Sequence, residues 1–200
     1  LFFLLINLTS AQLSSEVKDI IWKFASQTRA NITDANLHLA IALTLYKWKL
    51  EGVNHDSLIS EDLVRRVMGE CIHIEDFLVK SEIDLLLEQY TDVIDFCLHF
   101  VEYSPKSSSE YFQPISLTRF CSQLADFKKG SCIYNPFAGI GTYAIENPDC
   151  EFFGEELNMR VHLLLTLNLI AHGTVADYSL SNSFFECKKK AAKCDGVIDT

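Results

Sequence analysis

Polar and apolar residues alternate along the first part of the chain with the period of an amphipathic helix. The first such segment starts at Ser14 or Ser15, and either hydroxyl can accept a hydrogen bond from a free amide at a helix N-terminus. Trp22 lies in this segment and Trp48 in the next, and we expect both indoles to be shielded from water in a helical core. The apolar face of the first helix consists of Val17, Ile20, Ile21, Phe24 and Ala25.

The same pattern continues in three further helical segments. One is predicted to begin after Thr33 and to stop near Gly52, because a threonine hydroxyl can cap a helix start and glycine favours a helix end. Residues 60–62 and 81–84 combine serine with acidic residues, as at the first turn of a helix. Residues 14–103 are therefore predicted to be mostly helical.

The pattern changes at residues 103–109, a polar segment with the composition of a linker. We predict a domain boundary there, between a helical domain over residues 1–105 and a second domain over residues 106–200. In the second domain, strand and helix patterns follow the β-α-β-α-β order of a parallel sheet, which predicts an α/β fold. The predicted elements are a helix with Leu117, Phe120, Cys121 and Leu124 on its apolar face, strands near residues 131–134, 151–154 and 175–180, and a helix over residues 159–171 that stops at Gly173.

The composition limits what this chain can do. Its 200 residues are 48% apolar, enough to bury a core and too many for a disordered chain, and no apolar run has the length of a membrane helix. The 17 basic and 27 acidic residues give a net charge of −10, so the chain by itself is a poor binder of nucleic acid. The six histidines are scattered and predict no metal site. The seven cysteines include no C-x-x-C pair, and most are expected to be buried thiols of a cytoplasmic protein.

Residues 135–142 follow the first predicted strand and contain Gly139 and Gly141. At the carboxyl end of a parallel strand such a turn lets the backbone approach a ligand, although a tight turn without a ligand uses the same glycines. Glu156 lies fifteen positions after Gly141, at the end of the next strand, where a carboxylate can accept hydrogen bonds from both ribose hydroxyls of a nucleoside. Glu155 and Glu156 also suit the N-terminus of the following helix, where negative charge is favourable. One of the two residues can therefore hold the ribose while the other stabilises the helix start.

Five segments in the second half of the chain, and a sixth in the first half, resemble motifs of a single family. The segments and motifs are residues 109–114 with G-E-[FY]-[FY]-T-P, 135–142 with D-P-A-C-G-S-G-G, 153–158 with G-Q-E-I-N, 167–173 with N-L-x-x-H-G, 181–184 with G-D-T-L, and 21–29 with L-W-x-x-A-D-x-L-R. By these motifs the chain is similar to the N-6 DNA methylase family, which comprises the methyltransferase (modification) subunits of type I restriction-modification systems.

The resemblance implies a fold, an activity and a set of partners. The implied fold is an N-terminal helical domain followed by the cofactor half of a doubly wound, Rossmann-like sheet that binds S-adenosylmethionine (S-adenosyl-L-methionine). The implied activity is site-specific, S-adenosylmethionine-dependent methyl transfer to the exocyclic N-6 amine of adenine in DNA. The implied partners are DNA and the specificity and restriction subunits of a cytoplasmic restriction-modification complex, with no membrane.

The resemblance also implies roles for individual residues. Phe112 and Pro114 border the methionine end of the cofactor, and the backbone of the glycine turn cradles that end. Glu156 holds the ribose. Asn182 and Phe184 contact the adenine. The full set of implied cofactor-binding residues is Phe112, Gln113, Pro114, Asn135, Pro136, Phe137, Ala138, Gly139, Gly141, Thr142, Glu156, Leu157, Asn182, Ser183 and Phe184.

Three positions depart from the family pattern. Asn135 and Asn182 stand where the family usually has Asp, and Gln113 replaces Thr. An amide supplies no negative charge to the ammonium group of the cofactor. Two alternatives therefore stay open: a non-catalytic scaffold subunit of the same fold, and a related methyltransferase that acts on RNA or protein.

Residues 194–200 resemble the family's F-D-V-V-L-A-N strand, so Thr200 falls on the first position of the catalytic tetrapeptide. The resemblance then implies that the catalytic motif lies beyond Thr200. We expect the chain to be an N-terminal fragment that performs no methyl transfer of its own.

Overall fold

A computed structural model describes the chain as two compact units, Ser10–Glu110 and a second unit that contains Tyr111–Thr200. The predicted boundary between residues 105 and 106 lies outside the described residues and stays a prediction. None of the described helices is long and apolar enough to cross a membrane. The described residues are 13–28, 34–54, 59–68, 73–99, 113, 115–184 and 194–199.

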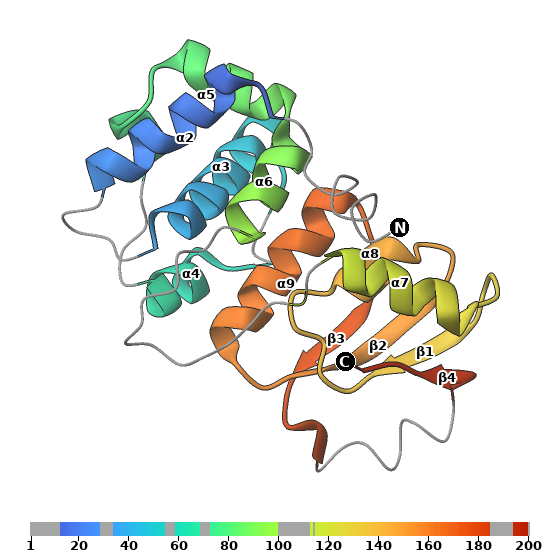
Figure 1. Cartoon of the computed structure of the whole chain (residues 1–200). Coiled ribbons are helices and arrows are strands. Elements are labelled where there is room, and N and C mark those ends of the chain that lie inside the picture. Colours follow the sequence, from blue (N-terminus) through green and yellow to red (C-terminus); the bar gives the residue numbers. More distant parts are fainter. Residues whose placement is uncertain are drawn as a thin grey trace. The chain divides into compact units, whose positions relative to one another are not determined.

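The described part of the first unit is mostly helical, which confirms the prediction from the apolar spacing (Figure 1). The apolar face predicted for the first helix is buried along its whole length, because its five members all point into the helical core. The elements are α2 (Ser15–Thr28), α3 (Ala35–Glu51), α4 (Glu61–Met68), the short 3-10 helix η2 (Ile74–Asp76), α5 (Lys80–Glu88) and α6 (Tyr90–His99).

Three of the predicted helix ends form as expected. The Ser14 hydroxyl accepts a hydrogen bond from the amide of Val17 at 3.2 Å, and the Ser60 hydroxyl accepts one from the amide of Leu63 at 3.1 Å. Helix α3 ends at Gly52, which has the left-handed conformation that glycine adopts without strain. The predicted cap at residue 33 lies outside the described residues.

The start of α5 differs from the prediction. The helix begins at Lys80, so Ser81 lies inside its first turn rather than before it. The cap comes from Glu82, whose carboxylate accepts a hydrogen bond from the amide of Val79 at 3.0 Å. The same carboxylate binds the Lys23 ammonium group at 2.7 Å, and this contact, followed by the Val79 amide, lowers the pKa of Glu82.

The two tryptophans have opposite environments. Trp48 is 3% exposed, as predicted, whereas Trp22 is 54% exposed, so the prediction for Trp22 is wrong. Trp22 follows Ile21 directly, and one residue turns a helix by about 100°. The indole is thereby carried off the buried face that Ile21 shares.

The second unit is built around a parallel sheet of four strands in the order β3-β2-β1-β4, with one helix between β1 and β2 and another between β2 and β3 (Figure 1). This arrangement confirms the predicted α/β fold. The strands are β1 (Cys132–Asn135), β2 (Glu151–Glu156), β3 (Asp177–Leu180) and β4 (Gly196–Val197), and the helices are α7 (Ile115–Ala125), α8 (Thr142–Glu146) and α9 (Met159–His172).

Helix α9 is fixed at both ends and packs through apolar side chains. The Asn158 side chain accepts hydrogen bonds from the amides of Arg160 and Val161, and Gly173 ends the helix in the left-handed conformation, as predicted. The apolar core between the helices and the sheet contains Ile133, Ala138, Tyr143, Ala144, Phe152, Leu165, Leu169 and Ile198.

Helix α7 forms where predicted but buries a different face. Leu117, Phe120 and Leu124 are exposed, whereas Thr118 and Ser122 are buried. The apolar periodicity therefore identified the helix correctly and its buried face wrongly. The buried hydroxyls make hydrogen bonds to α8 and to the residue that follows it, which accounts for their burial.

The expectation that most cysteines are buried is wrong for the described part of the chain. Only Cys97 is buried there, and burial raises the pKa of its thiol to about 12. Cys121, Cys132, Cys150 and Cys194 are partly exposed, and none of these five forms a disulfide.

The contrast between the two indoles predicts unequal quenching of tryptophan fluorescence. Iodide should quench the emission of Trp22 and leave that of Trp48 nearly unchanged, because a charged quencher does not enter a packed core. The variant Trp22→Phe should therefore lose most of the quenchable emission, and Trp48→Phe should retain it. Equal quenching in the two variants would contradict the exposure of Trp22.

Candidate functional site

The turn after β1 depends on its two glycines. Gly139 and Gly141 have φ angles of +55° and +77°, a region that other residues adopt only with strain. A Cβ atom at Gly141 would also lie 3.3 Å from Cγ of Leu165 on α9. The glycines are therefore needed for a tight turn packed on α9, whether or not the turn also approaches a ligand.

The carboxylate of Glu156 joins this turn to the start of α9. Its Oε2 accepts a hydrogen bond from the amide of Gly139 at 3.1 Å, and its Oε1 accepts one from the amide of Asn158 at 2.8 Å. A carboxylate oxygen can accept more than one hydrogen bond. Glu156 is half-buried at the carboxyl end of β2, where its carboxylate joins the turn to the start of α9.

Glu155 has a different environment. It is 1% exposed, and its Oε2 accepts a hydrogen bond from the hydroxyl of Tyr134 at 2.6 Å. Its backbone carbonyl accepts one from the amide of Ala138, which holds the chain after β1 against β2. Of the two acidic residues, Glu156 reaches the turn with its carboxylate and Glu155 lies in the interior.

The segment after β3 approaches the turn after β1 through two aromatic rings. Phe184 is 82% exposed and Phe137 is 48% exposed, and their ring centroids are 5.7 Å apart. The Asn182 Oδ1 accepts a hydrogen bond from the amide of Phe184 at 3.0 Å, while Ser183 is buried. Since β2 lies between β1 and β3, the two rings meet across the carboxyl end of β2, where Leu157 is also exposed.

The remaining predicted residues are mostly interior. Asn135 is 1% exposed, and its Oδ1 has no hydrogen-bond partner. Pro136, Ala138 and Thr142 are buried as well. The side chain of Asn135 is therefore shielded from solvent, whereas that of Phe137 is exposed.

Gln113 contacts the helix after the glycine turn. Its Nε2 donates a hydrogen bond to the hydroxyl of Tyr143 on α8 at 3.2 Å. Phe112 and Pro114 lie outside the described residues. The structure thus links one of the three predicted residues of this segment to the element that follows the turn.

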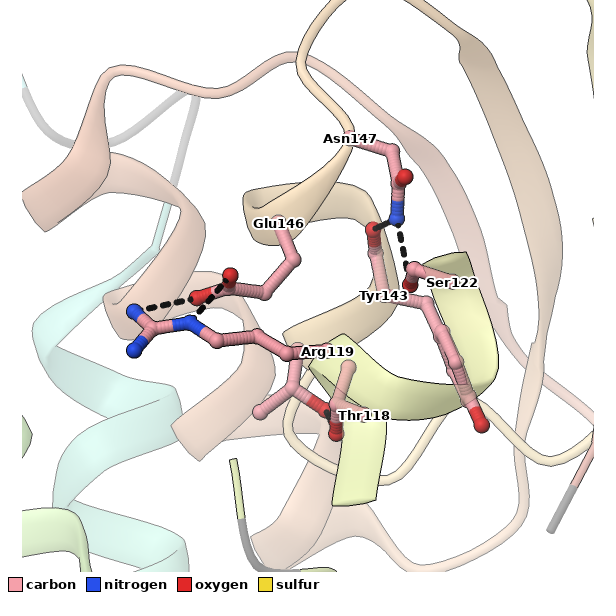
Figure 2. A network of polar contacts seen from close by, with 7 residues as sticks. Thr118, Arg119, Ser122, Tyr143, Glu146 and Asn147 are labelled. Carbon is pink, nitrogen blue, oxygen red and sulfur yellow. Dashed lines mark hydrogen bonds and ion pairs between the residues drawn. The ribbon is translucent and has the colours of Figure 1, made fainter. Parts of the chain in front are cut away.

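Polar side chains connect α7 to α8 and to the residue that follows it (Figure 2). The Arg119 guanidinium binds both carboxylate oxygens of Glu146, at 2.6 and 3.0 Å. The other contacts of this α7–α8 network are those of Thr118 with Thr142 at 3.2 Å and of Asn147 with Ser122 at 2.9 Å.

Sequence reasoning assigned no role to several residues that hold the turn. The Nδ2 of Asn168, in the middle of the apolar helix α9, donates a hydrogen bond to the carbonyl of Ile140 at 2.9 Å. The feature of the sequence that could have indicated this role is a polar residue, Asn168, among the leucines of an apolar helix. Arg119 and Glu146 lie 27 positions apart, and no local pattern connects them.

Among the described residues, no group of three or more His, Cys, Asp or Glu side chains is placed to hold a metal ion.

The sequence profile of the N-6 DNA Methylase family matches residues 82–199, so the chain belongs to this family. A curated relative is the Type I restriction enzyme MjaVII methylase subunit of Methanocaldococcus jannaschii, with 30% identity over 131 residues. The match covers 60% of this chain and 21% of the relative. The chain thus spans about a fifth of the length of that relative.

Two solved structures are similar to this chain. One is a modification subunit assigned to a type I restriction enzyme of Vibrio vulnificus YJ016, with a TM-score of 0.51, 13% identity, and coverage of 84% of this chain and 56% of that chain. The other is a type I restriction-modification system methyltransferase subunit of Streptococcus thermophilus, with a TM-score of 0.44, 13% identity, and coverage of 90% and 42%. At this identity, the likeness to the Vibrio vulnificus subunit shows a shared fold.

The bidentate ion pair of the α7–α8 network should contribute to stability. Replacing Arg119 by Met should lower the free energy of unfolding by about 1 kcal/mol, because the pair has good geometry and Glu146 is mostly buried. Adding Glu146→Gln should then cost little more, since its partner is already gone. Urea denaturation measures both effects. As a matched control, the exposed pair of Lys129 and Asp149 should contribute almost nothing, and equal losses at the two pairs would contradict this prediction.

Proposed function

We propose that the chain carries the S-adenosylmethionine-binding part of a DNA adenine N-6 methyltransferase subunit of a restriction-modification system. Membership of the N-6 DNA Methylase family supports the general class of activity. The observation that carries the cofactor assignment is the carboxylate of Glu156, which lies at the carboxyl end of β2 within hydrogen-bond distance of the turn after β1. In open parallel sheets, ligands bind outside the carboxyl ends of the strands.

The described residues fit the three parts of this cofactor. The Glu156 carboxylate lies at the carboxyl end of β2, where we assign it to the two ribose hydroxyls, since a carboxylate oxygen can accept more than one hydrogen bond. Phe184 and Asn182 follow β3 and offer a ring face and an amide to the adenine. The backbone of residues 137–142, with Gln113, lies on the side proposed for the methionine end. When bound, the cofactor supplies an electrophilic methyl group on a sulfonium centre.

The chain's own residues position this cofactor and shape its surroundings. Phe137 and Phe184 cover the end of β2 with apolar surface, which removes water from the adenine and ribose. The hydrogen bond between Glu156 and Gly139 holds the turn next to the carboxylate, so that the turn and the carboxylate can each contact their part of the cofactor. Proximity and orientation of this kind account for a large part of the rate of group transfer.

The proposed partners are DNA and the specificity and restriction subunits, and the proposed compartment is the cytoplasm. The net charge of −10 opposes direct binding to phosphates. Affinity for DNA in this proposal therefore comes from the assembly, in which other subunits supply the basic surface.

A non-catalytic scaffold subunit is the second candidate, and the amides at two family Asp positions favour it. Asn135 is buried and provides no charge, and the Oδ1 of Asn182 already accepts a hydrogen bond from Phe184. A methyltransferase acting on RNA or protein shares the cofactor part and differs in its substrate.

The ribose assignment predicts that Glu156→Gln weakens binding of S-adenosylhomocysteine about tenfold, because the neutral amide has one acceptor atom instead of two. Titration calorimetry with this chain measures the affinity. Glu151→Gln makes the same charge change at the exposed amino end of β2 and should have no effect. An analogue without ribose hydroxyls should lose less affinity with Glu156→Gln, because it loses only the support that the second carboxylate oxygen gives to the amide of Gly139 or Asn158.

The outcomes of this titration separate the candidates. A Glu156→Gln affinity within about twofold of the unchanged chain would refute the ribose contact. Equal weakening for the analogue without hydroxyls would assign Glu156 to the turn alone. No binding of S-adenosylhomocysteine by the unchanged chain would favour the scaffold.

The substrate class is tested with the complete subunit assembled with its specificity partner. Incubation with methyl-labelled S-adenosylmethionine and duplex DNA should place the label in N6-methyladenine after digestion to nucleosides. Label in RNA or protein, with none in DNA, would favour the related methyltransferases. No label in any substrate, despite cofactor binding, would favour the scaffold.

A further inference from the structure

Three residues form one row across the three neighbouring strands of the sheet. Asn135 of β1 pairs with Gly154 of β2, and Gly154 pairs with Tyr178 of β3. Paired residues of parallel strands direct their side chains to the same face. The side chains of Asn135 and Tyr178 therefore flank a position on β2 that has no side chain.

Gly154 is required by space rather than by backbone conformation. A Cβ atom there would lie 1.8 Å from the backbone oxygen of Asn135 and 3.2 Å from Cε1 of Tyr178. Its φ is not in the left-handed region. The absence of a side chain at Gly154 thus leaves room for the Tyr178 ring and for the backbone oxygen of Asn135.

The polar atoms of Tyr178 and Asn135 are buried next to each other. Neither the Tyr178 hydroxyl nor the Asn135 Oδ1 has a hydrogen-bond partner in the structure. Burial raises the pKa of Tyr178, and the neighbouring Asn135 side chain opposes this shift to a smaller degree. The tyrosine therefore stays protonated, a donor beside an amide that has a free acceptor. Buried polar atoms of this kind are costly to leave unpaired.

Asn135 is the last residue of β1, so its orientation determines where the glycine turn begins. The turn then crosses the end of β2, where the Ala138 amide donates to the Glu155 carbonyl and the Gly141 amide donates to the Ala138 carbonyl. The orientation of Asn135 therefore affects the first residues of the turn.

We propose that Tyr178 is a positioning residue for the glycine turn, acting from β3 through Asn135 across the gap at Gly154. This inference rests on the proposed function, in which the turn holds the amino-acid end of the cofactor. Asn135 is buried, so the pair acts on the ligand through the turn and not by contact. Tyr178 then affects affinity for the amino-acid end and leaves the nucleoside end unaffected.

Tyr178→Phe tests the inference, since it removes only the hydroxyl. Titration calorimetry compares S-adenosylhomocysteine with 5′-methylthioadenosine, which lacks the amino-acid end. We expect Tyr178→Phe to weaken S-adenosylhomocysteine about fivefold and to leave 5′-methylthioadenosine within about twofold. Tyr134→Phe is the matched control, because it removes a buried hydroxyl from β1, at the residue before Asn135 and on the other face of the sheet. Its affinity ratio for the two ligands should equal that of the unchanged chain.

A double-mutant cycle tests whether Tyr178 acts through Asn135. In the background of Asn135→Ala, the further change Tyr178→Phe should have no additional effect on S-adenosylhomocysteine. Additive effects, or equal weakening of both ligands, would overturn the inference and leave the proposed function intact. Failure of the unchanged chain to bind either ligand would overturn the proposed function, and this inference with it.

Discussion

The two hydrogen bonds accepted by the Glu156 carboxylate hold together the parts of the second unit from which a ligand site can be built. Gly139 belongs to the turn after β1 and Asn158 to the start of α9, and both donate their amides to this side chain. Backbone amides at turns and helix starts need partners, and here one carboxylate serves two elements. Because Glu156 is the last residue of β2, the rigid sheet sets the position of both.

Directional polar contacts add to apolar packing in positioning the glycine turn. Ala138 and Ile140 are buried, and between them the turn is also held by Asn168, which binds the Ile140 carbonyl, and by Glu156. The α7–α8 network extends this support to the helix that precedes β1. Hydrogen bonds fix orientation as well as distance, which a turn next to a cofactor requires.

The differences between expectation and structure have a common origin. Apolar spacing located α7, but its leucines are exposed and its hydroxyls are buried against α8. Trp22 was assigned to a core because it lies in a helix with an apolar face, although its angular position places it off the face of Ile21. Periodicity describes one element at a time, whereas burial depends on which neighbour covers it.

The sequence by itself determined the alternation of helices and strands, several helix ends such as those at Ser14, Gly52 and Gly173, the glycine turn with Glu156 after the next strand, and the resemblance to the N-6 DNA methylase family. These features depend on residues a few positions apart, or on motifs in a fixed order. Only the tertiary structure decided that Phe137 meets Phe184, that Arg119 binds Glu146, and that Tyr178 reaches Asn135 over Gly154. Such contacts join residues that are distant in the chain, and they form only when the strands and helices pack together.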